Sequence, residues 1–117
     1  MNIMKISGEE EKVKQILTDP KLSVIKTMLE KDHAIDCLLL LYINRGKWKD
    51  AKDFMHDNKL TLSDGTFRSR MIEIEGLGLA KSERIDPLKK YYLSTPLGEK
   101  VAKLLLGFFD TLEKHSV

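Results

Sequence analysis

The chain has 117 residues, of which 42% are hydrophobic and 32% charged, and its formal net charge is +2. This composition indicates one globular domain with one hydrophobic core and excludes a disordered chain. The net charge is too small to indicate nucleic-acid binding by itself, and the single cysteine, Cys37, excludes a disulfide framework or a cysteine-rich zinc cluster within the chain.

The first 31 residues predict two short helices that serve as packing elements. Apolar residues recur at helical spacing over residues 9–17, which predicts the first helix there. Asp19 followed by Pro20 is typical of an N-cap and a first helical position, so the second helix is predicted to begin at this pair.

A central core helix is predicted at about His33–Arg45, with Asp32 as its N-cap and Gly46 at its C-terminal cap. Its apolar residues cover nearly the whole circumference, as in a helix buried on all sides. This apolar run is far shorter than the roughly 20 residues that span a bilayer, and the N-terminus lacks a signal-peptide pattern. A cytoplasmic protein without membrane association is therefore expected.

After Gly46 a short amphipathic helix is predicted, with Trp48, Phe54 and Met55 on its apolar side. Residues 58–63 indicate a turn in which Leu60 and Leu62 point inward.

The next helix runs from about Ser63, its N-cap, to Gly76. Phe67, Met71 and Ile74 share one face and are predicted to lie in the core. The opposite face carries small or exposed residues: Gly65, Ser69, Ile72 and Gly76, with Arg68 at its edge.

Beyond Gly78 the periodicity changes, and residues 79–82 and 90–94 each fit a short strand. Asp86-Pro87 between them is a turn signal, so a β-hairpin with a longer loop is predicted. Thr95-Pro96 then begins a long final helix. The predicted fold class is mainly α with a small β-hairpin (α+β).

Two segments resemble winged helix-turn-helix regulators of the MarR-like and PadR-like superfamily. Residues 66–79 (TFRSRMIEIEGLGL) are similar to the recognition helix, which opens on a Thr-apolar pair and ends in a Gly-Leu pair, here Gly78-Leu79, before the wing. Residues 91–100 (YYLSTPLGEK) are similar to the second wing strand and the start of the last helix. Two features depart from the family pattern: a slightly long stretch between Phe54 and Thr66, and Ser94 in place of the more usual threonine.

The resemblance implies a single winged-helix domain over residues 1–117. It comprises an N-terminal helical extension (1–31), a helix-turn-helix core and wing (32–95), and a C-terminal helix for dimerisation (96–117). The implied function is sequence-specific double-stranded DNA binding by a prokaryotic-type transcriptional regulator. The recognition helix, about Ser63–Gly76, would enter the major groove, and the wing, about Leu79–Ser94, would contact the backbone or minor groove.

The residue types fit this chemistry, since arginine can read guanine and lysines can hold phosphates. The predicted DNA-binding residues are Gly65, Thr66, Arg68, Ser69, Arg70, Ile72, Lys81, Arg84, Lys89, Lys90, Lys47 and Lys49. Two observations leave alternatives open. Arg70 could instead pair with Glu73 or Glu99, and basic and acidic residues are nearly equal in number over residues 63–100. The near-neutral charge favours the alternative of a winged-helix protein–protein interaction module without DNA binding.

The last helix has an apolar stripe too wide for the core of one small domain. The residues predicted to form a homodimer interface are Val101, Leu104, Leu105, Phe108, Phe109 and Leu112. The alternative is a helix folded back over the two N-terminal helices of its own chain.

No convergent set of polar residues indicates catalysis, so neither an enzyme nor a cofactor is expected. Asp32, His33, Asp36 and Cys37 form the only cluster with metal-ligand chemistry. They fit a helix cap beside a core cysteine equally well, and no metal site is predicted.

Overall fold

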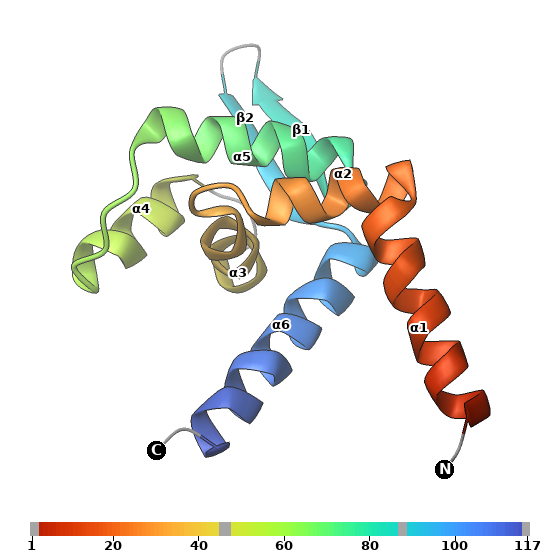
Figure 1. Cartoon of the computed structure of the whole chain (residues 1–117). Coiled ribbons are helices and arrows are strands. Elements are labelled where there is room, and N and C mark those ends of the chain that lie inside the picture. Colours follow the sequence, from red (N-terminus) through yellow and green to blue (C-terminus); the bar gives the residue numbers. More distant parts are fainter. Residues whose placement is uncertain (1–2, 45–47, 87–88, 116–117) are drawn as a thin grey trace. The chain divides into compact units, whose positions relative to one another are not determined.

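The computed structural model describes residues 3–44, 48–86 and 89–115 (Figure 1). These residues are mainly helical with one antiparallel two-stranded hairpin, which confirms the predicted α+β composition. The chain divides into two compact units, Met1–Asp32 and His33–Val117, called here the N-terminal and C-terminal units. No helix in the described ranges is both long and apolar enough to cross a membrane.

The N-terminal unit consists of α1 (Ile3–Thr18) and α2 (Pro20–Leu29). The Asp19 carboxylate accepts hydrogen bonds from the backbone N–H groups of Lys21, at 2.8 Å, and Leu22, at 3.4 Å, so the predicted N-cap is confirmed. The first helix begins six residues before the predicted position 9. Ile3 and Ile6 continue the helical spacing of apolar residues in that direction.

In the C-terminal unit, α3 (Ala34–Asn44) contacts α4 (Trp48–Asp57), α5 (Asp64–Gly76), β2 (Lys89–Ser94) and α6 (Pro96–His115). Its buried side chains follow the predicted all-round apolar pattern. The His33 carbonyl accepts the first helical bond, from the Cys37 N–H at 2.9 Å, so His33 rather than Asp32 holds the N-cap position. The predicted C-cap, Gly46, lies outside the described residues.

The hairpin pairs β1 (Ala80–Asp86) with β2, in a register that places Ala80 opposite Ser94 and Ser82 opposite Tyr92. Only residues 87–88 separate the strands, so the predicted longer loop is wrong. A two-stranded ribbon can expose both faces to solvent, so its outer part shows no apolar alternation that the sequence could reveal. The register shifts between Arg84 and Asp86.

The base of the hairpin is joined to the start of α6 by backbone contacts. The Thr95 hydroxyl donates to the Gly78 carbonyl at 2.7 Å and accepts from the Gly98 N–H at 3.0 Å, which caps α6. The Thr95 N–H also donates to the Leu79 carbonyl at 3.2 Å. Gly98 is buried, and a Cβ atom at this position would overlap the Leu79 carbonyl oxygen. Glycine is therefore required where α6 crosses the hairpin base.

Candidate functional site

The helix α5, which corresponds to the predicted recognition helix, is held in place by its buried face. Phe67, Met71 and Ile74 are buried, which confirms their predicted place in the core. The Ser63 side chain accepts a hydrogen bond from the Thr66 N–H at 3.1 Å, and its hydroxyl donates to Thr66 Oγ1 at 2.9 Å. The N-cap prediction is thus confirmed, and the cap fixes where the helix begins.

The opposite face of α5 is open to solvent. Gly65, Arg68, Ser69 and Ile72 are all exposed, and 56% of the Ile72 surface is accessible. Arg68 makes no hydrogen bond or ion pair with any residue in the described ranges. Thr66 is half-buried. This face combines small residues, a free guanidinium and one isolated apolar side chain, a surface on which a partner could approach the helix backbone closely.

Arg70 lies at the side of the same helix and is engaged by the protein. Its Nη1 donates to both Glu73 carboxylate oxygens, at 2.6 and 2.8 Å, and both side chains are largely shielded from solvent. Of the two partners expected from the sequence, Glu73 is the one that pairs. An arginine held in this way is less available to an external ligand than Arg68.

The acidic side chains between α5 and the hairpin also have donors. The Ser82 hydroxyl donates to Glu75 at 2.5 Å, and the Tyr91 hydroxyl donates to Glu83 at 2.6 Å. The bond to the Glu83 carboxylate raises the pKa of the Tyr91 phenol because it favours the protonated form. These bonds turn carboxylate oxygens toward the protein's own donors.

The helix α5 contacts β1, the strand that carries two of the cations predicted on the wing, Lys81 and Arg84. Lys81 and Arg84 are exposed on β1, and the Lys81 Nζ is 3.8 Å from a Glu83 oxygen. Lys89 and Lys90 belong to β2 and Lys49 to α4, but the side chains of these three lysines lie outside the described part of the chain. The whole of Lys47 also lies outside it.

The apolar residues predicted for dimerisation divide into two groups on α6. Val101 and Leu105 are half-buried. Those along the rest of the stripe are exposed: Leu104, Phe108, Phe109 and Leu112. The Phe108 and Phe109 rings pack edge to face, with centroids 5.3 Å apart. The stripe therefore extends beyond what the described part of the unit covers.

The cluster with metal-ligand residue types is used locally. His33 Nδ1 lies 2.8 Å from Asp36 Oδ2. Cys37 is fully buried, and burial, with a smaller effect from the Asp36 charge, raises the pKa of its thiol to about 12. Among the described residues, no three His, Cys, Asp or Glu side chains gather into a possible metal site.

The sequence did not predict two features of this unit. Thr95 was expected only as a helix cap, and its bond to Gly78 depends on a contact between residues far apart in the chain. Leu60 was predicted to point inward but is 52% exposed, because it borders a cavity at the end of α4. No local pattern distinguishes a leucine that fills a core from one that lines an open cavity.

Comparison of the chain with models of known protein families, with curated proteins and with solved structures finds no match. The resemblance to winged-helix regulators therefore rests on the residues of this chain alone.

Proposed function

We propose that the C-terminal unit is a winged helix-turn-helix domain and that the protein binds double-stranded DNA sequence-specifically as a homodimeric transcriptional regulator. The observation that carries the proposal is the two-sided character of α5. Its buried face holds the helix in place, and its exposed face presents Arg68 among small residues. An α-helix about 10–12 Å across fits the major groove of B-DNA.

The exposed side chains of α5 have chemistry suited to reading bases. The free Arg68 guanidinium can donate two bonds to guanine, and Ser69 can donate or accept at a base edge. Ile72 can contact a thymine methyl group, and Gly65 allows the backbone to come close to the DNA. The N-terminal amides of α5 can bind a phosphate.

The hairpin and α6 supply the remaining parts of the proposed complex. Lys81 and Arg84 on β1 would hold phosphates next to the groove that α5 occupies. The exposed stripe of α6 would pair with a second copy and place two α5 helices on DNA about one helical turn apart.

Fluorescence anisotropy with a labelled random-sequence duplex tests the proposal. We expect a dissociation constant of roughly 10⁻⁴ to 10⁻⁶ M that rises steeply with salt. Arg68→Ala should weaken binding several-fold. Lys114→Ala is the matched control, because it also removes one cation but lies at the end of α6 paired with Asp110. Equal loss in both variants would indicate only a non-specific charge effect.

A protein-binding module is the second candidate, favoured by the nearly equal numbers of basic and acidic residues over 63–100. Against it, the neighbours of Ile72 on the surface of α5 are Arg68, Ser69, Glu75 and Gly76 rather than other exposed apolar residues. Absence of DNA binding even at low salt would reject the DNA proposal and leave this candidate.

A further inference from the structure

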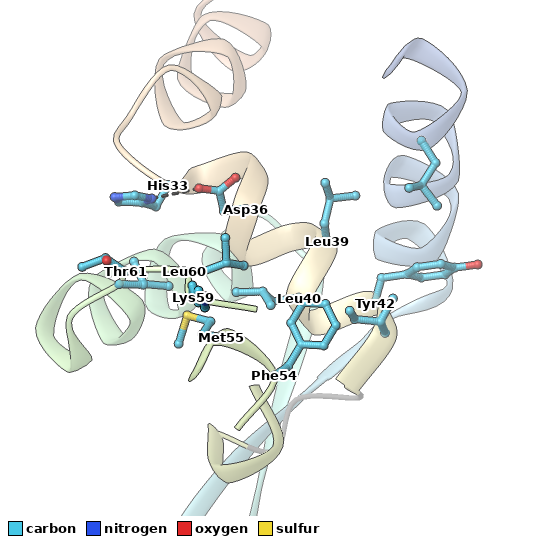
Figure 2. A pocket seen from close by; sticks show the side chains of 13 residues that line it. His33, Asp36, Leu39, Leu40, Tyr42, Phe54, Met55, Lys59, Leu60 and Thr61 are labelled. Atoms are coloured by element: carbon cyan, nitrogen blue, oxygen red, sulfur yellow. Dashed lines mark hydrogen bonds and ion pairs between the residues drawn. The ribbon is translucent and has the colours of Figure 1, made fainter. Parts of the chain in front are cut away.

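A cavity of about 520 Å³ opens between α3, the end of α4 with the segment that follows it, and α6 (Figure 2). Every described residue that lines it belongs to the C-terminal unit. Its volume falls within the range of about 300–1,000 Å³ that is usual for small-molecule sites. The predicted DNA contacts on α5 and the hairpin take no part in its walls.

The lining changes character along the cavity. Near the start of α3 it includes polar side chains: His33 just before the helix, Asp36 in its first turn, and Lys59 and Thr61 in the segment after α4. Figure 2 shows these polar side chains at one end, with Leu60 and Met55 beside them, and Phe54 and Tyr42 at the other. The lining also includes the Tyr42 ring and apolar side chains: Leu39, Ile43, Phe54 and Leu106. The α3 residues of the lining run from Asp36 to Ile43, which span about 10 Å along the helix axis.

The charges at the polar end favour an anion. Asp36 Oδ2 lies 2.8 Å from His33 Nδ1, so this carboxylate is already engaged by a side chain of the protein. Within the described ranges, Lys59 makes no ion pair. The Thr61 hydroxyl makes no hydrogen bond with these residues either. An acidic head group would gain an unpaired cation and a free donor.

The backbone is strained at the same end. Among the described residues, the non-glycine residues with positive φ are His33, at 62°, and Lys59, at 57°. Lys59 follows α4, where the Leu60 N–H bonds back to the Met55 carbonyl at 2.8 Å, a helix end that normally takes glycine. Strained residues of this kind cluster at ligand sites. Both of these line the cavity.

We propose that this cavity binds a single-headed anionic amphiphile, such as a medium-chain carboxylate. The hydrocarbon tail lies along Ile43, Phe54 and Leu106, and the carboxylate meets Lys59 and Thr61. The proposal does not depend on DNA binding, because it concerns a separate wall of the unit.

Isothermal titration calorimetry of the full chain with decanoate, decanol and decylammonium, each below its self-association concentration, tests the head group. We expect decanoate to bind tightest and decylammonium weakest. Lys59→Asn removes the cation while keeping a residue that tolerates positive φ. It should weaken decanoate binding by up to about fivefold, as for an exposed ion pair, and leave decanol unchanged.

A second pair of variants tests the location. Leu106→Trp should fill the cavity and weaken decanoate binding by roughly tenfold or more. Leu97→Trp, at another exposed leucine of α6 that lies outside both the lining and the proposed dimer interface, should leave it unchanged. Thermal denaturation checks that both variants fold, as expected for exposed positions. Unaltered affinity in Leu106→Trp overturns the location, and equal binding of decylammonium overturns the head-group assignment. No saturable decanoate binding overturns the proposal.

Discussion

At Gly98 the backbone of α6 approaches the hairpin base so closely that no side chain fits. Gly98→Ala forces the Leu79 carbonyl to move, and we expect it to lower the free energy of unfolding by about 3 kcal/mol. Gly107 provides the control on the same helix, because a Cβ atom there meets nothing within 4 Å. Gly107→Ala should raise stability by about 0.5–1 kcal/mol, since alanine is the better helix former. Urea denaturation of both variants gives the two signs.

The buried thiol of Cys37 predicts a pH dependence of stability. In the unfolded chain it ionises near its ordinary pKa of 9.0, whereas in the folded protein it stays protonated up to about pH 12. The unfolded state therefore binds fewer protons than the folded state between these values, and stability falls as the pH rises above 9. The slope attributable to Cys37 is at most about 1.4 kcal/mol per pH unit.

The measurement is the free energy of unfolding from pH 8 upward, compared between the wild type and Cys37→Ala. The variant is less stable at pH 8 because it leaves a small cavity, but its stability should decline less steeply with pH. Parallel curves for the two proteins would mean that the thiol titrates alike in the folded and unfolded states.

At the scale of the elements, Thr95 joins the turn after α5 to the start of α6. Thr95→Val keeps the shape of the side chain but loses the bonds to Gly78 and Gly98, and we expect a loss of about 1–2 kcal/mol. Thr95→Ser retains the hydroxyl and should cost well under half as much. Denaturant titration distinguishes them. A serine variant as unstable as the valine variant would show that loss of the methyl group costs as much as loss of the hydroxyl, and would contradict this prediction.

The elements whose limits depend on local chemistry could be predicted from the sequence. Ser63 and Asp19 cap helices with their own side chains, and the apolar spacing of α5 identified its buried face. The hairpin was predicted too short, because its outer part lacks apolar alternation. Leu60 was placed wrongly because whether it meets a core or a cavity depends on α3 and α6, which are distant in sequence.

At the scale of the whole molecule, the exposed stripe on α6 predicts self-association. Leu104 is 74% exposed, and Leu104→Glu together with Phe108→Glu places charges in the proposed interface. We expect the wild type to be a dimer and this double variant a folded monomer by size-exclusion chromatography with light scattering. Lys103→Glu, on the same helix but off the stripe, should remain a dimer. A monomeric wild type would contradict the proposed dimer.

The DNA proposal depends on how side chains pair in the folded molecule more than on any single residue. The sequence identified the exposed residues of α5, but it could not show which acids the protein itself engages. The pairing of Arg70 with Glu73 and of Ser82 with Glu75 arises only when side chains have been placed. The sequence alone therefore could not distinguish Arg68, whose guanidinium is unpaired among the described residues, from Arg70, which is paired with Glu73.

The close approach of Gly98 to Leu79 also bears on how a dimer would measure its binding site. The contact joins main chain to main chain. We therefore expect α6 and the hairpin base to move together as one rigid body. In a dimer built on α6, the distance between the two hairpin tips would then be fixed by the dimer interface. Substitutions on the hairpin surface would alter which groups are touched, while the spacing between the two half-sites would stay the same.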